Sequence, residues 1–191
     1  MTTSQLYSEL NYVDASREKR QFYAQMVIEN PELIPSLIEI LFMVDDKISC
    51  KAAWVLEYAY NSNLELILPH LDLFTKDLKK IHFDSAVRPV AKISELLVEA
   101  YYNKKNNFVK KYLKPKHLEC ITEVCFDYMI REEKVAPKAF AMNTLFLLGR
   151  DYDWIHPELK VILERDFNKQ SAAFKARAKH IIKKLERTDK P

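Results

Sequence analysis

Seven side chains have the types and the spacing to bind a negatively charged ligand. The cations recur at matched positions of helical segments, and residues four apart on a helix share one face. Two aromatic side chains with the same four-residue spacing would lie at one end of these basic columns. Such an arrangement suits a nucleic-acid backbone or an acidic peptide. The candidate binding residues are Trp54, Tyr58, Arg88, Lys92, Lys138, Lys175 and Lys179.

The same residues also fit plainer roles. Lysines on helices commonly project into solvent, and a tryptophan on a helix commonly packs between neighbouring units. In a binding role, Trp54 and Tyr58 would instead stack on a base or hold a partner's side chain. Both explanations stay open at the level of sequence.

Catalysis and metal binding have weaker signals. Glu57 and Glu95 occupy equivalent positions in two segments, and paired carboxylates can transfer protons, although on helices they are usually surface charges. His117 and Cys120 could share a helix face while Cys125 points elsewhere, which leaves a zinc site short of ligands. The five histidines show no local catalytic signature. We therefore expect no catalytic residues, no metal and no cofactor.

Composition excludes several classes of protein. The chain has 191 residues, 48% of them hydrophobic, which is enough for one sizeable or layered core. Gly149 is the single glycine, so no glycine-rich loop can hold a phosphate. No run reaches the roughly 18 apolar residues of a membrane span, and the N-terminus does not resemble a secretion signal. We expect a soluble, cytoplasmic protein whose three cysteines stay reduced.

Charge is distributed unevenly along the chain. Residues 1–100 carry 10 Lys and Arg against 15 Asp and Glu, a net charge of −5, whereas residues 101–191 carry 20 against 12, a net charge of +8. A basic C-terminal half favours an anionic partner, with simple solvation of lysines as the alternative. Residues 103–116 are predicted to form a long irregular connector, rich in lysine and free of acids, that is a local candidate for such contact.

Four prolines mark the elements that must position these side chains. Pro31, Pro69, Pro115 and Pro157 each lead into an apolar helical stretch, at intervals of 38, 46 and 42 residues. Proline suits the first turn of a helix, because its missing N–H would have no partner there and its φ is already helical. The regular intervals indicate an array of helical repeats.

A second helix recurs within each of these units. The second helices can be aligned on Ala53, Ala91, Ala141 and Ala178, which we expect to be buried because small side chains let helices approach closely. The units then span residues 31–61, 69–103, 115–149 and 157–187, and a further helix at residues 14–29 caps the first. The predicted fold is an all-α, right-handed superhelical solenoid of four helix pairs plus an N-terminal cap helix.

The pattern Asp84-x-x-Val87-Arg88-x-x-Ala91 resembles the core signature of HEAT repeats. This resemblance implies an armadillo-type fold whose second helices line a concave side. It also implies a ladder of charges between neighbouring second helices, in which Asp46 or Asp84 pairs with Arg88 or Lys138. Repeats of this kind serve many functions, so the resemblance specifies the architecture more closely than the activity.

The segments around Trp54, Arg88 and Lys175 also resemble short bacterial HEAT-like proteins that are often labelled adenylosuccinate lyase. The true lyases are similar to the fumarase superfamily, which has longer chains and a catalytic serine in a mobile glycine-rich loop. A chain with one glycine has no counterpart of that loop. We therefore expect no cleavage of adenylosuccinate.

From these patterns we predict a non-catalytic scaffold that binds a protein partner, an acidic one by charge, through the face formed by the second helices. The alternative is a nucleic-acid-binding protein similar to the HEAT-like alkylpurine DNA glycosylases, which use a basic groove with aromatic residues and a carboxylate. Lyase activity, as the label suggests, is the third hypothesis. In the glycosylase hypothesis the groove would be formed by Trp54, Glu57, Tyr58, Lys92 and Lys138.

Overall fold

A computed structural model describes residues 1–103 and 108–188, and in these ranges the regular structure is entirely helical. The predicted all-α fold is confirmed, whereas Lys104 and Lys105 of the predicted basic connector lie outside the described residues. The α-helices are α1 (Thr3–Leu10), α2 (Arg17–Glu29), α3 (Ile34–Leu41), α4 (Ile48–Ser62), α5 (Leu71–Thr75), α6 (Asp84–Tyr102), α7 (Val109–Tyr112), α8 (Pro115–Ile130), α9 (Val135–Leu148), α10 (Ile155–Asp166) and α11 (Ala172–Thr188). The 3-10 segments are η1 (Pro31–Leu33), η2 (Leu64–His70) and η3 (Leu78–Lys80).

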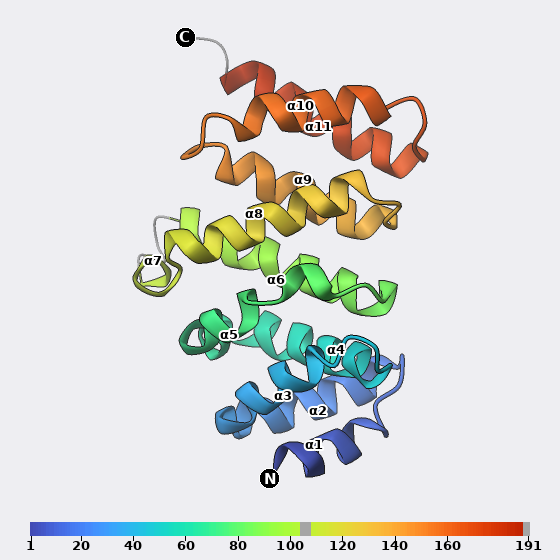
Figure 1. The fold of residues 1–191 in the computed structure, drawn as a ribbon, viewed down its shortest axis with the longest axis vertical. Coiled ribbons are helices and arrows are strands. Elements are labelled where there is room, and N and C mark those ends of the chain that lie inside the picture. Colours follow the sequence, from blue (N-terminus) through green and yellow to red (C-terminus); the bar gives the residue numbers. More distant parts are fainter. Residues whose placement is uncertain (104–107, 189–191) are drawn as a thin grey trace.

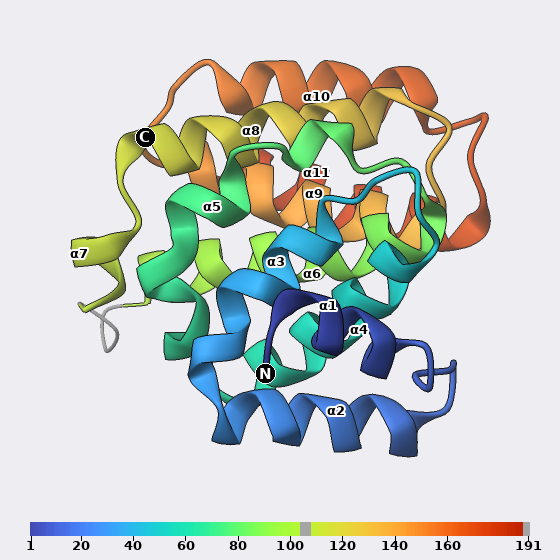
Figure 2. The same ribbon diagram turned by 60° about the horizontal axis from the view of Figure 1, so that its bottom comes forward.

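The helices stack in two layers along one long axis (Figure 1). In the second-helix layer, α2 packs on α4, α4 on α6, α6 on α9 and α9 on α11. In the first-helix layer, α1 packs on α3, α3 on α5 and α5 on α8, and α10 lies against α9 and α11. Figure 2 shows this arrangement with the N-terminal end turned forward. None of the helices in the described part of the chain is long and apolar enough to cross a bilayer.

The N-terminal end differs from the predicted single cap helix. The helix predicted at residues 14–29 is α2, which belongs to the second-helix layer, and α1 precedes it as a first-layer helix. A capping box starts α1: the Thr2 hydroxyl accepts from the Gln5 backbone N–H, and the Gln5 side chain accepts from the Thr2 N–H. Leu6 and Leu10 then bury the inner face of α1. Two helices, α1 and α2, therefore precede η1 in the described part of the chain, where the sequence predicted one.

Small residues hold the second-helix layer together, as predicted. Ala53, Ala91, Ala141 and Ala178 are all buried, each with at most 1% of its surface exposed. Pro31 and Pro115 begin η1 and α8, whereas Pro69 lies within η2 and Pro157 is the third residue of α10. The described part of the 103–116 connector is not irregular throughout, because it contains α7 and two buried anchors, Val109 and Leu113.

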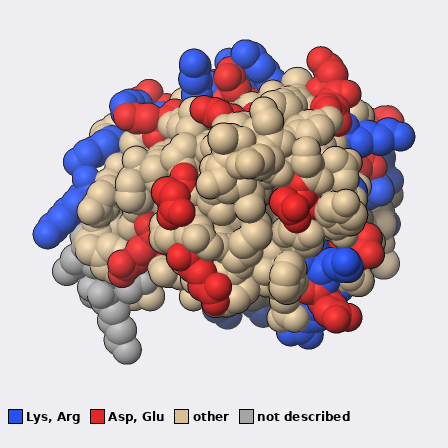
Figure 3. All heavy atoms as spheres, turned by 90° about the horizontal axis from the view of Figure 1, so that it is seen from below, with Lys and Arg blue, Asp and Glu red and all other residues tan. Residues whose placement is uncertain are grey.

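The surface at the N-terminal end carries little positive charge. Seen from that end, uncharged residues cover most of the surface, acidic side chains lie across its middle and basic side chains gather toward the rim (Figure 3). This distribution agrees with the net charge of −5 of residues 1–100. The middle of this end is therefore unsuited to an anionic ligand.

Gly149, the single glycine, follows the last residue of α9. Its φ is −63°, a conformation open to every residue type, and no described residue has a positive φ. Glycine is needed there for space, because a Cβ atom would collide with the imidazole of His156. That imidazole stacks on Phe146, with ring centroids 5.5 Å apart, and its Nε2 lies 2.9 Å from the Phe146 carbonyl oxygen.

We expect Gly149→Ala to lower the free energy of unfolding by about 1–3 kcal/mol, because the new methyl group displaces the His156 ring. Urea denaturation measures the change. The matched control is a double-mutant cycle with His156→Ala, in which the second substitution removes the clashing ring. An equal cost of Gly149→Ala in both backgrounds would show that the collision is not the cause.

Candidate functional site

Two adjoining hollows lie where α4, α6 and α9 begin, and Trp54, Asp84 and Ser85 line both of them. Their volumes are about 560 and 230 Å³. Five cations and one carboxylate face these hollows, so the surface is strongly basic. We call it the Trp54 basic surface, formed by Arg20, Lys47, Lys51, Trp54, Asp84, Ser85, Arg88 and Lys134.

Trp54 connects three second-layer helices. From α4, its indole N–H donates a 2.8 Å hydrogen bond to the carbonyl oxygen of Ser85 on α6. Arg20 of α2 places its guanidinium 5.5 Å from the centroid of the Trp54 ring and 5.4 Å from that of Tyr58. Both rings are half-buried. Trp54 therefore packs between repeats and also lines both hollows.

Arg88 binds a buried carboxylate of the preceding repeat. Its Nη1 lies 2.7 Å from Oε2 of Glu57, which is 4% exposed. This charge-assisted hydrogen bond joins α6 to α4. The predicted ladder partners were wrong, because Asp84 pairs with Lys134 at 3.0 Å and Asp46 accepts from the Tyr7 hydroxyl at 2.7 Å.

Lys92 lies one turn after Arg88 on α6 and takes part in polar contacts that join neighbouring repeats. Its Nζ lies 2.7 Å from Oε2 of Glu95, one turn further along the same helix. Glu95 also accepts from Asn143 of α9 at 3.0 Å, and Asn143 donates to Glu99 as well. Glu57 and Glu95 therefore bind separate partners and do not form a pair of carboxylates.

Lys138 does not reach the surface that the sequence predicted for it. It is 3% exposed, its Nζ donates a 3.3 Å hydrogen bond to the Met129 carbonyl oxygen, and it lies 6.0 Å from the centroid of the Phe174 ring. The physical reason is that α9 is packed against α6, α8, α10 and α11 and has little free surface. Lys138 is therefore a structural residue, which corrects the prediction.

The remaining two predicted residues lie on α11. Lys175 is half-buried and Lys179 is exposed, and neither lines the two hollows. Of the seven predicted residues, the structure gathers Trp54, Tyr58 and Arg88 around Arg20. Sequence reasoning missed the contributions of Arg20, which lies on α2, and Lys134, the N-cap of α9, because neither has a spacing relation to Trp54.

Cys125 and His117, two residues considered for metal binding, are both buried. Burial raises the pKa of the Cys125 thiol to about 12, far from that of a nucleophilic thiolate. His117 is buried, its Nδ1 accepts from the Lys114 N–H, and its Nε2 therefore donates to Asp72 at 2.6 Å. Within residues 1–103 and 108–188, no three His, Cys, Asp or Glu side chains are arranged to hold a metal ion.

Comparison with known proteins identifies the repeat. A model of the HEAT repeat domain matches residues 9–185, which is nearly the whole chain. No curated protein and no solved structure matches the sequence significantly, so no named relative supports the lyase label. The two-layered helix pairs and the match over residues 9–185 agree that this chain belongs to the HEAT repeat family.

Proposed function

We propose that this HEAT repeat chain is a scaffold that binds an acidic segment of a partner protein at the Trp54 basic surface. The supporting observation is the pair of hollows that share Trp54 and face five cations and one carboxylate. Stacked helix pairs offer extended surfaces of this kind for binding. The predicted binding face covered the whole second-helix layer. The proposed site is smaller and lies at the N-terminal ends of α4, α6 and α9.

The side chains at this surface have the chemistry for such a partner. Lys47 and Lys134 are exposed, and the ion pair between Lys134 and Asp84 is a surface pair of small energy that a ligand carboxylate can replace. Arg88 bonds to Glu57 through Nη1, and a guanidinium has further donors to offer. Trp and Arg are also the residue types that dominate binding energy at protein interfaces.

The test is fluorescence anisotropy with a short, glutamate-rich peptide that carries a fluorescein label. We expect the double variant Lys47→Glu and Lys134→Glu to raise the Kd about tenfold or more, because both ammonium groups become carboxylates. The matched control is Lys76→Glu with Lys169→Glu, two exposed lysines outside the hollows. Equal losses in the two double variants would mean that net charge alone attracts the peptide.

Oligonucleotides separate this proposal from the nucleic-acid hypothesis. Labelled single-stranded and double-stranded DNA are titrated at low and moderate salt, because phosphate contacts make affinity fall steeply with salt. The glycosylase hypothesis needs Glu57 and Lys138 to face the groove. Glu57 is instead buried in an ion pair with Arg88, and Lys138 is buried beneath the surface. DNA could bind more tightly than the peptide, and the double variant Lys47→Glu and Lys134→Glu could abolish that binding. This result would show that the partner is a nucleic acid and not a protein.

A further inference from the structure

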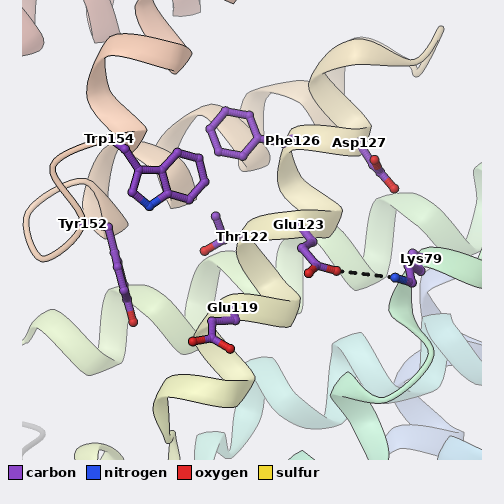
Figure 4. A pocket seen from close by; sticks show the side chains of 8 residues that line it. All are labelled: Lys79, Glu119, Thr122, Glu123, Phe126, Asp127, Tyr152 and Trp154. Atoms are coloured by element: carbon purple, nitrogen blue, oxygen red, sulfur yellow. Dashed lines mark ion pairs between the residues drawn. The ribbon is translucent and has the colours of Figure 1, made fainter.

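A larger hollow lies on the first-helix layer, between α8 and the connection from α9 to α10 (Figure 4). Its volume is about 840 Å³, which exceeds that of either hollow at the Trp54 basic surface. Acidic side chains of α8 line one side, and aromatic side chains before α10 line the other. We call it the acidic groove, lined by Lys79, Glu119, Thr122, Glu123, Phe126, Asp127, Tyr152 and Trp154.

The charge of the acidic groove is opposite to that of the Trp54 basic surface. Glu119, Glu123 and Asp127 follow one another at every fourth position of α8 and so share a face. Lys79 is the one lysine or arginine among the lining residues. Its ion pair with Glu123 spans 3.5 Å between side chains that are 65% and 66% exposed, so an incoming cation can replace Lys79 at little cost. No ion pair between described residues involves Glu119.

One ring on the aromatic side of the groove, that of Trp154, is exposed. Trp154 is 55% exposed, and its ring stacks on Phe126 with centroids 5.5 Å apart and planes at 22°. Figure 4 shows these two rings together at one end of the groove, with Glu119 and Glu123 nearby on α8. A planar guanidinium can stack on an indole while its N–H groups bond to a carboxylate, whereas a lysine ammonium can lie over the ring but has no plane to stack on it. The groove therefore favours arginine over lysine.

The spacing of the carboxylates fits a repeated cation. Four residues of α-helix advance about 6 Å, and alternate residues of an extended chain are about 6.6 Å apart. An extended segment with arginine at every second position would therefore place one guanidinium near Glu119 and the next near Glu123, whereas Asp127 already pairs with Arg131 at 3.0 Å. The exposed side chains of Ile130 and Val161 continue the faces that bear Phe126 and Trp154 and could contact apolar residues of the same segment.

We propose that the acidic groove binds an extended, arginine-bearing segment of a partner protein. This site is independent of the Trp54 basic surface, because it lies on the other helix layer and selects the opposite charge. The scaffold then has one face for an acidic segment and one for a basic segment. Either proposal can fail while the other stands.

The experiment measures anisotropy of labelled peptides that alternate serine with arginine, lysine or glutamate, added to the full chain. We expect the arginine peptide to bind about fivefold more tightly than the lysine peptide, and the glutamate peptide to avoid the groove. Neutralising the groove with Glu119→Gln and Glu123→Gln should weaken the arginine peptide about tenfold. Both glutamates are exposed, so thermal melting should show an intact fold.

The matched control is Glu18→Gln with Glu32→Gln, two exposed glutamates near the N-terminal end, which should leave Kd within about twofold of the unmodified chain. In a separate variant, Trp154→Leu should remove the preference for arginine over lysine. Equal weakening by the control, or equal affinity for the arginine and lysine peptides, would overturn the proposal. Sedimentation provides a further check. If the unmodified chain were a dimer and the double variant Glu119→Gln and Glu123→Gln a monomer, a second copy would fill the groove and the proposal would be overturned.

Discussion

Lys138→Glu is expected to lower the free energy of unfolding by about 3–5 kcal/mol, the usual cost of an uncompensated buried charge. The new carboxylate would face the Met129 carbonyl oxygen, which is also an acceptor, in a site that is 3% exposed. Acidic neighbours add repulsion: the pKa of Asp166 lies below its ordinary value mainly because Arg165 bonds to it, and the positive charge of Lys138 contributes. A loss of this size would lower the melting temperature by about 6–20 °C.

Two controls isolate the effect of the buried charge. Lys138→Met keeps the apolar stem and removes the ammonium group, so its cost should be about 1 kcal/mol, from the hydrogen bond to Met129. Lys179→Glu makes the same charge reversal at an exposed site of α11 and should cost about 0.5 kcal/mol or less. Urea denaturation ranks the three variants. If Lys138→Glu proved as stable as Lys179→Glu, Lys138 would have to be solvated, contrary to its place beneath α11.

Phe74→Ala is the second substitution with a large expected effect. Phe74 is fully buried on α5, the five-residue helix of the first-helix layer that packs against α3, α8 and η2. A helix this short has no stability of its own, so its position depends on buried anchors. Deleting the ring should lower the free energy of unfolding by about 3–5 kcal/mol. Backbone amides of η2 and α5 should exchange faster than those of α4.

The same deletion at Phe22 provides the control. Phe22 lies on α2, is 65% exposed and contacts Tyr23 edge to face, with ring centroids 5.2 Å apart. Phe22→Ala should therefore cost about 1 kcal/mol or less. Similar denaturation midpoints for the two variants would contradict the anchoring role of Phe74.

The fold was predictable because its signals are local. The alanines aligned across the second helices are all buried, and each of the four prolines lies at or near the start of a helical segment of the first layer. The start of α1 was missed although its signal is present, since Thr2 and Gln5 have the spacing of a capping box. The short α7 was missed because Val109 and Leu113 are too few apolar residues to show a helical period.

The site was less predictable because its residues come from four helices. Spacing along α4 indicated that Trp54 and Tyr58 share a face. The sequence of α2 contains no pattern that predicts the position of Arg20 over these two rings. Alignment of the second helices placed Arg88 and Lys138 at equivalent positions, and this equivalence was misleading. Arg88 is partly exposed beside Glu57, whereas Lys138 is buried between helices, because the packing around α9 differs from that around α6.

The backbone of this array has a consequence for how its sequence can change. No residue in the described ranges adopts a positive φ, and even Gly149 is constrained by the neighbouring His156 ring and not by its own dihedral angles. The backbone dihedral angles of the described turns therefore require neither glycine nor asparagine, and only the His156 ring demands glycine, at position 149. Apart from Gly149, side chains at these turns, including those just before α4, α9 and α10, can be exchanged without backbone strain. A descendant of this chain can thus acquire new ligands by substitution at the turns while the packed alanines keep the layers in place.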